Sequence, residues 1–452
     1  MAEKSTIMQS DLSGKDGAQL HSRYNPQLEA VRYISSLSLN PNTEYFILIE
    51  PGEGYMIPVL QEKFPNSKII ALYVNDPEPE EKLDKELTLN TLQQNTPAIK
   101  IIEWRPSMNY YKDAYVKLLS KTVKYVKRFE AEKRTVSFFG KRWVNNFFRN
   151  IGNINSALLY KKTDIPVIIT GSGPSLESAL LDIKKIQENC LIIAASSSVM
   201  ALGHNGIKPD LVIATDGGGW AVKHLYPFYR YYGNNTGGLA ITLCAALPSQ
   251  CYNTPALLLN DGSLWQSVIL HELQLPSVLI PQRGTVTASA IDLALQLTSG
   301  NIYLAGLDLA VNDIQTHIKP YVFDNMFLEK STRYSPLYSQ YFTRSSLIKE
   351  GGSMDIYAEW FKTQYGLWPK RIYNLNDYSG QALKKTGEYF KNVPVRCKNG
   401  IDILLAALKN SIHEKDLRAE LEPLLGKDIE NYLSSLHALA ASHPDAPQGS
   451  IN

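Results

Sequence analysis

Cysteine is scarce in this chain, long apolar runs are missing, and neither sign of charge dominates. The four cysteines among 452 residues show no paired C-x-x-C spacing, so the sequence offers no disulfide framework and no cysteine-based metal site. No apolar run approaches the roughly 18 residues that a membrane span requires. The formal net charge of +2 provides no general attraction for nucleic acids or anionic membranes. We therefore expect a cytoplasmic protein with no nucleic-acid partner and no membrane partner.

The length and the order of apolar segments predict several domains. Strands that alternate with helices predict a mostly parallel, doubly wound sheet in the central part of the chain. The expected domains are a Rossmann-like N-terminal domain over 1–105, a helical linker over 106–150, a central α/β domain over 151–386, a small helical region over 387–440 and a disordered tail over 441–452.

The N-terminal domain shows the order strand, glycine turn, helix, strand. The spacing Glu50-x-Gly52-x-Gly54 looks like the first motif of S-adenosylmethionine-dependent methyltransferases. In such sites the second strand usually ends in an acidic residue that holds the ribose. Here that strand, 68–74, ends without one, and Asp76 comes only beyond it. We interpret this domain as a dinucleotide-type fold that has lost its cofactor.

A second glycine turn follows the apolar strand that begins at Ile165. A helix N-terminus just after a strand offers unpaired N–H groups and a positive dipole end, which bind phosphate. Pro174 suits the first helical position because its φ is already helical. The alternative is an ordinary strand-to-helix turn without a ligand. The candidate phosphate-binding residues are Gly171, Ser172, Gly173, Pro174 and Ser175.

Further polar residues follow the neighbouring strands. Ser196 follows the strand 191–195, Asp216 ends the next strand with Gly217 directly after it, and Asp308 comes after a later strand. Ligands of parallel α/β sheets bind at the carboxyl ends of the strands. We therefore expect these residues to face one crevice together with the second glycine turn.

Several separated motifs occur along the chain in a fixed order: Leu20–Pro26, Gly54-Tyr55, Gly171–Leu176, Ile207–Asp210 before the strand that ends in Asp216, Gly306–Ala310, Thr316-His317 and Tyr373-Asn374. Taken in order, these motifs resemble the bacterial motility accessory factors (Maf) over about residues 20 to 385. The resemblance implies a flagellin glycosyltransferase that moves a nonulosonic acid, pseudaminic or legionaminic acid, from its CMP ester to Ser or Thr hydroxyl groups.

The central domain is in turn similar to MptE-like proteins and to CMP-dependent bacterial sialyltransferases. The sialyltransferases use tyrosine hydroxyl groups at the leaving phosphate and a histidine as base. Ala310 stands where their Gly-Ile-Asp-Phe-Tyr segment has its tyrosine, and Tyr321 lies near enough to replace it. Glu350 stands near the position of their base, and His317 is the other candidate base. Asp308 matches the aspartate of the same segment.

The resemblance implies CMP-nonulosonic acid as the donor substrate, flagellin as the acceptor, and no cofactor. Ser196 and Asp216 would hold the nucleoside. Sugar transferases that hold a diphosphate through a metal usually carry Asp-x-Asp, and this chain has no such triplet. A single leaving phosphate can be stabilised by N–H and hydroxyl donors alone, so we expect no metal site.

Two other functions fit some of the same residues. Archaeal 6-hydroxymethyl-7,8-dihydropterin diphosphokinases resemble the same central domain, and their reaction with ATP and Mg²⁺ would need Asp216 and Asp308 near the phosphates. The large flanking domains argue against that function, since a small-molecule kinase needs no surface for a protein acceptor. Ala310 keeps open a third function, that of a non-catalytic flagellin-binding assembly factor.

Overall fold

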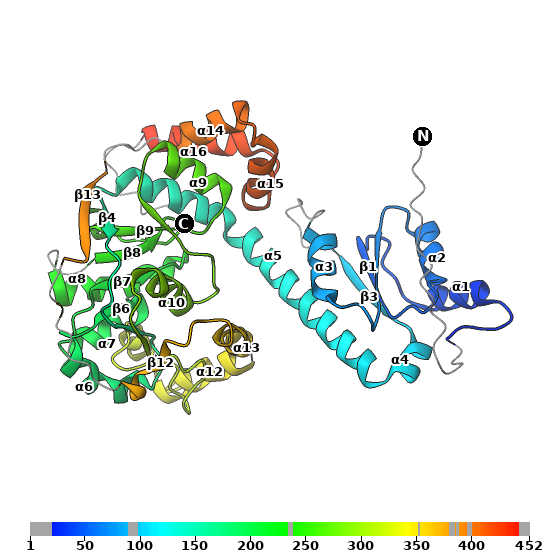
Figure 1. The fold of residues 1–452 in the computed structure, drawn as a ribbon, viewed down its shortest axis with the longest axis horizontal. Coiled ribbons are helices and arrows are strands. Elements are labelled where there is room, and N and C mark those ends of the chain that lie inside the picture. Colours follow the sequence, from blue (N-terminus) through cyan, green and yellow to red (C-terminus); the bar gives the residue numbers. More distant parts are fainter. Residues whose placement is uncertain are drawn as a thin grey trace. The chain divides into compact units, whose positions relative to one another are not determined.

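The computed structural model describes residues 20–88, 98–233, 238–350, 353–378, 385, 388–395 and 400–442. The chain divides into two compact units, Met1–Phe138 with Glu422–Gly426 and Phe139–Leu421 with Lys427–Asn452. The main boundary between them falls inside α5, Asp113–Asn153, a helix of 41 residues (Figure 1).

The first unit is built on a parallel sheet with the strand order β2-β1-β3. Its central strand β1 is buried along its whole length because successive side chains point to opposite faces, and both faces are covered. Phe46 and Leu48 pack with α1 and α2, whereas Ile47 and Ile49 pack with α3 and α5. The elements are α1 Pro26–Ser36, β1 Tyr45–Ile49, α2 Met56–Lys63, β2 Lys68–Leu72, α3 Pro79–Thr88, β3 Ile99–Glu103 and α4 Arg105–Tyr111.

The second unit contains a ten-stranded sheet within the described residues. Its strands are β4 Ser156–Tyr160, β5 Val167–Thr170, β6 Leu191–Ala195, β7 Leu211–Ala214, β8 Gly238–Thr242, β9 Ala256–Asn260, β10 Ser277–Leu279, β11 Ile302–Ala305, β12 Ile372–Asn374 and β13 Phe390–Pro394. Its helices besides α5 are α6 Leu176–Ile186, α7 Val199–His204, α8 Tyr226–Tyr232, α9 Leu264–Glu272, α10 Val286–Leu297, α11 Asp324–Glu329, α12 Leu337–Glu350, α13 Ser353–Tyr365, α14 Gly400–Asn410 and α16 Ile429–Ser442. α15, Glu414–Leu425, begins in this unit, and its residues from Glu422 onward are assigned to the first.

The strand order β12-β11-β5-β6-β7-β8-β9-β4-β13, with β10 beside β9, confirms the predicted doubly wound, mostly parallel sheet. From β5 the chain moves in one direction through β6 to β9, and it then returns to the other side of β5 as β11. Such a reversal is a topological switch point, the place where open α/β sheets usually bind ligands. In this unit it lies between β5 and β11.

The C-terminal region is helical as predicted, but the range 387–440 also contains a strand. β13 pairs antiparallel with β4 at the edge of the large sheet. Neither strand was predicted, because each is short and its ladder partners are distant in sequence. α16 extends to Ser442, into the range expected to be a disordered tail; the rest of that tail lies outside the described residues.

The loops that follow β5 and β11 contact each other directly at the switch point. Gly171 N–H donates to the carbonyl of Ala305 at 2.8 Å, and Gly173 N–H donates to the carbonyl of Gly306 at 2.8 Å. A Cβ atom on Gly171 would lie 2.3 Å from the Gly306 oxygen. Gly306 itself has a φ of +68°, where glycine is favoured. These glycines are therefore required by the packing of one loop on the other.

We expect Gly171→Ala to lower the free energy of unfolding by about 1–3 kcal/mol, because its methyl group meets backbone that cannot move away cheaply. Gly219→Ala is the matched control, since a Cβ there meets nothing within 4 Å. Urea unfolding of the two variants and the wild type measures the difference. Equal midpoints for both variants would contradict the packing role of Gly171.

Candidate functional site

The N-terminus of α6, where the sequence predicts a bound phosphate, already holds a carboxylate. Ser175 N–H donates to Oδ2 of Asp308 at 2.7 Å, and the Ser175 hydroxyl donates to Oδ1 of the same residue. A carboxylate is stabilised there by the N–H group and by the positive end of the helix dipole. Because α6 begins at Leu176, Pro174 lies in the preceding turn and is not the first helical residue as predicted.

The rest of this turn faces the loop after β6 and the segment around Ile318. The Ser197 hydroxyl donates to Oγ of Ser172 at 2.9 Å, and Ile318 N–H donates to the Ser172 carbonyl at 2.8 Å. Ser196 is buried at the start of the short 3₁₀ helix η1, Ser196–Ser198. The structure therefore brings the predicted Ser172 to the loop that contains the predicted Ser196, with the contact made by its neighbour Ser197.

Beside Ile318, four side chains form what we call the Tyr321 cluster: His224, His317, Tyr321 and Arg344. The His317 ring stacks on the Tyr321 ring, with 4.2 Å between centroids and 17° between planes. Nε2 of His224 lies 3.0 Å from the Tyr321 hydroxyl oxygen. Cζ of Arg344 lies over the same ring, 5.5 Å from its centroid. The cluster thus joins the 3₁₀ helix η2, Gly219–His224, to the segment that follows β11 and to α12.

Neighbouring residues hold Tyr321 in place. Its backbone N–H donates to Oδ2 of Asp324 at 2.8 Å, and the other oxygen of that carboxylate accepts from the Tyr341 hydroxyl at 2.6 Å. Phe323 packs edge-on against Tyr321 and His224, at centroid distances of 5.5 and 5.3 Å. A phenol held from several sides is pre-organised for directed hydrogen bonding.

Both histidines of the cluster are neutral at pH 7. Burial lowers the pKa of His224 to about 4, although nearby Asp216 opposes this shift. Burial, with a smaller contribution from Arg344, lowers the pKa of His317 to about 3. Burial also raises the pKa of Tyr321, so its hydroxyl stays protonated. Arg344 lies over the Tyr321 and Phe327 rings and hydrogen-bonds to the Tyr321 hydroxyl. In the described part of the chain it is in no ion pair, which leaves its charge for an anionic ligand.

Of the two predicted residues after β7, only Asp216 lies near the cluster. Asp216 is exposed and accepts from Gly218 N–H at 2.7 Å. Gly217 is buried, its carbonyl accepts from Nδ2 of Asn146 at 3.2 Å, and a Cβ on it would lie 2.4 Å from Cδ1 of Trp143. Gly217 therefore packs against the C-terminal part of α5.

Glu350, a predicted alternative base, is the last residue of α12, and its side chain lies outside the described part. Sequence reasoning missed His224 and Arg344. His224 carried a weak signal, since it follows a predicted strand end by eight residues. Arg344 carried none, because no motif surrounds it and only the packing of α12 brings it to Tyr321.

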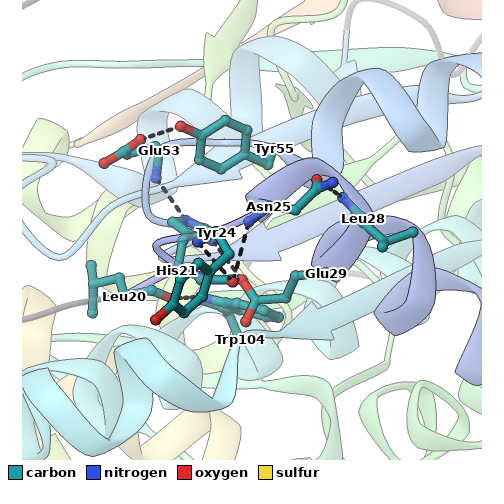
Figure 2. Close-up of polar contacts among 10 residues, drawn as sticks. Leu20, His21, Tyr24, Asn25, Leu28, Glu29, Glu53, Tyr55 and Trp104 are labelled. Carbon is teal, nitrogen blue, oxygen red and sulfur yellow. Dashed lines mark hydrogen bonds and ion pairs between the residues drawn. The ribbon is translucent and has the colours of Figure 1, made fainter.

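The N-terminal glycine turn is filled by a side chain of the chain itself. Figure 2 shows the imidazole of His21 against this turn, where its Nε2 accepts from Glu53 N–H at 3.1 Å. A Cβ on Gly52, whose φ is +61°, would lie 2.4 Å from that nitrogen. The His21 ring stacks on Trp104 at 5.3 Å and meets the Tyr55 ring edge-on at 4.9 Å. The space that a nucleotide phosphate would need is thus taken.

The acidic residues near this turn are also engaged by backbone. Oε2 of buried Glu50 accepts from Val74 N–H at 2.6 Å, and Oδ2 of Asp76 accepts from Tyr73 N–H at 2.9 Å. Burial raises the pKa of Glu50. These contacts, together with His21, are the physical reason to expect no nucleotide in this turn.

None of the helices among the described residues is long and apolar enough to cross a membrane. In the same residues, no group of three or more His, Cys, Asp or Glu side chains is arranged to hold a metal ion.

Comparisons with known proteins name the two families that the sequence motifs resemble. Residues 141–313 match the model of a family described as 6-hydroxymethylpterin diphosphokinase MptE-like. A solved Maf glycosyltransferase from Magnetospirillum magneticum AMB-1 is similar at 15% identity and a TM-score of 0.42, over 63% of this chain and 51% of that one. An uncharacterized protein of Treponema pallidum (strain Nichols) is 28% identical over 275 residues, 61% of this chain. This chain spans 58% of that relative's length.

The neutral histidines predict a loss of stability in acid. Between pH 6.5 and about 4, His224 and His317 become protonated in the unfolded chain and stay neutral in the folded chain. The free energy of unfolding therefore decreases as the pH falls through this range. At pH 5 this amounts to at most about 2 kcal/mol per histidine. Urea unfolding gives the free energy of unfolding at pH 7.5 and at pH 5. The decrease in this free energy between the two pH values should be smaller for His317→Gln than for the wild type. The exposed His271→Gln is the control and should keep the full difference.

For the N-terminal turn, we expect that neither S-adenosylmethionine nor NAD raises the melting temperature of the wild type. We also expect His21→Ala to lower stability by about 1–3 kcal/mol, because Glu53 N–H loses its acceptor and Trp104 its stacking partner. Tyr24→Ala is the control, since Tyr24 is 99% exposed. Stabilisation of the wild type by either nucleotide would refute the role of His21 as the group that fills this turn.

Proposed function

We propose that this protein is a glycosyltransferase that moves a nonulosonic acid, pseudaminic or legionaminic acid, from its CMP ester to Ser or Thr hydroxyl groups of flagellin. The observation that carries the proposal is the Tyr321 cluster, where a cation, a phenol and neutral imidazoles meet beside the glycine turn. The ordered motifs that resemble motility accessory factors support the same assignment. The reaction takes place in the cytoplasm and involves neither nucleic acid nor membrane.

The proposed step is a direct displacement at the anomeric carbon of the donor sugar. The acceptor hydroxyl oxygen forms the new bond to that carbon as the bond to the CMP phosphate oxygen breaks. The electron pair leaves with CMP, whose phosphate gains a negative charge, and Arg344 and the Tyr321 hydroxyl stabilise it. The acceptor proton passes to the neutral imidazole of His317, with Glu350 as the alternative base. The step uses no metal and no cofactor besides the donor.

The donor lies along the predicted turn and the adjacent strand ends. Gly171, Ser172, Gly173, Pro174 and Ser175 form one side of the donor site. Ser196 and Asp216 form the part that holds the nucleoside, whereas Gly217, predicted with them, is buried against α5 and supports the loop from behind. Asp308 acts by positioning Ser175, since both of its oxygens are engaged there. The leaving phosphate is therefore placed next to Arg344, where the charge is positive, and away from the Asp308 carboxylate.

One observation favours the diphosphokinase alternative. Residues 141–313 match the model of a family that is described as 6-hydroxymethylpterin diphosphokinase MptE-like. That reaction would need Asp308 near Mg²⁺ and the ATP phosphates, whereas the Asp308 carboxylate binds Ser175. The assembly-factor alternative requires binding of flagellin without transfer. The two experiments below separate the three functions.

Ligand binding separates the enzymes. We expect CMP to raise the melting temperature and ATP with Mg²⁺ to leave it unchanged, because the site offers donors for one phosphate. Differential scanning fluorimetry at millimolar ligand measures this. Stabilisation by ATP with Mg²⁺ and not by CMP would replace the transferase with the diphosphokinase.

Transfer is tested by the intact mass of flagellin co-expressed with this protein and a CMP-nonulosonate pathway. We expect a mass increase with the wild type, and about a 100-fold slower transfer with Arg344→Ala, because the leaving phosphate loses its cation. Arg333→Ala is the matched control, since Arg333 is exposed shortly before α12. An unmodified flagellin that still binds this protein, with donor supply confirmed, would favour the assembly factor.

A further inference from the structure

The Tyr321 hydroxyl group has two polar neighbours: Nε2 of His224 lies 3.0 Å from its oxygen, and Arg344 hydrogen-bonds to it. His224 belongs to η2, which follows β7 in the chain, whereas Tyr321 belongs to the segment that follows β11. No sequence motif pairs these residues. Phe323 packs edge-on against His224 at 5.3 Å, which restricts the orientation of the imidazole.

The direction of this hydrogen bond follows from chemistry, given the proposed function on which the inference rests. A phenol carries one hydrogen and accepting lone pairs, and an ionised phosphate group only accepts. The Tyr321 hydroxyl can therefore meet a phosphate only as the donor. Its oxygen is then left to accept, and the hydrogen at His224 must be on Nε2. Since the imidazole of His224 is neutral, its Nδ1 carries no hydrogen in that state.

We propose that His224 is a positioning residue for the transfer reaction. Its Nε2–H donates to the Tyr321 oxygen and thereby turns the phenolic hydrogen toward the leaving phosphate. His224 acts through Tyr321 and touches neither the donor nor the acceptor.

The rings that surround Tyr321 explain why a separate positioning group is useful. His317 stacks on one face of the Tyr321 ring, and Arg344 lies over the ring as well, so these contacts fix the plane of the phenol. Arg344 also donates to the Tyr321 hydroxyl oxygen, which leaves that oxygen one lone pair for a further donor. A second hydrogen bond, from His224, occupies that lone pair and turns the phenolic hydrogen away from both donors before the transition state is reached, which favours a faster chemical step over tighter donor binding.

A double-mutant cycle in the transfer assay tests the proposal. We expect His224→Phe, which keeps an aromatic ring beside Phe323, to lower kcat by about 10- to 100-fold with little change in KM for the CMP donor. Tyr321→Phe should lower kcat by at least as much. The double variant should be no slower than Tyr321→Phe, because His224 has nothing to position once the hydroxyl is gone. His224→Gln retains an amide N–H donor and should recover part of the rate.

The exposed His271→Phe is the matched control and should transfer at the wild-type rate. Independent losses that multiply in the double variant, or a wild-type kcat for His224→Phe, would overturn the positioning role. A ¹⁵N NMR spectrum of histidine-labelled protein with CMP bound reports which nitrogen of the His224 imidazole carries the hydrogen. A purely structural role of His224 would not require one particular tautomer. It should show the Nε2–H tautomer of His224, and the Nδ1–H tautomer would refute the proposal.

These outcomes are distinct from failure of the proposed function. A wild type that neither binds CMP nor modifies flagellin would remove the proposed transferase and this inference with it. A wild type that transfers the sugar, with kcat unaffected by His224→Phe, would remove this inference alone.

Discussion

The close contact between the loops after β5 and β11 is the constraint on which the candidate site depends. Gly171 and Gly306 let the two backbones approach so closely that a methyl group on either would overlap the other, and Asp308 joins the second loop to Ser175. This contact occupies the switch point itself. The chain after β11 then returns across the turn, where Ile318 N–H binds the Ser172 carbonyl and sets Tyr321 beside it. The packing of the two loops therefore decides where the chemistry can lie.

The electrostatics of the Tyr321 cluster follow from burial combined with one unpaired cation. Desolvation makes protonation of His224 and His317 costly, and the charge of Arg344 makes it more so. The cluster therefore holds positive charge only at Arg344 and keeps both imidazoles neutral. An anionic ligand bound at Arg344 would reverse part of this penalty, since a nearby negative charge raises a histidine pKa. Ligand binding and proton acceptance would thus support each other in the proposed reaction.

The two glycine turns share one physical feature. Each has the geometry that commonly accepts a nucleotide phosphate, and in each a side chain of this protein is placed against it. His21 accepts from the N-terminal turn, and Asp308 accepts from the turn before α6. A strand, a glycine turn and a helix are thus compatible with a ligand and equally with an internal partner. In the second unit, the residues beside the turn still offer a cation and neutral bases, and in the first unit the nearby carboxylates are engaged by backbone.

Local patterns in the sequence determined much of the fold and one part of the site. Apolar runs followed by glycine or polar residues predicted strands β5 to β9 and β11, the parallel sheet and the position of the turn, because burial of both faces of a strand is recorded in consecutive residues. His317 and Tyr321 were predicted from motifs and do lie together. Only the tertiary structure decided the rest: that strands β4 and β13 pair, that Asp308 binds Ser175, that His21 enters the first turn, and that His224 and Arg344 reach Tyr321. Each of these contacts joins residues far apart in the chain, and no local periodicity or propensity encodes which distant partner a side chain will meet.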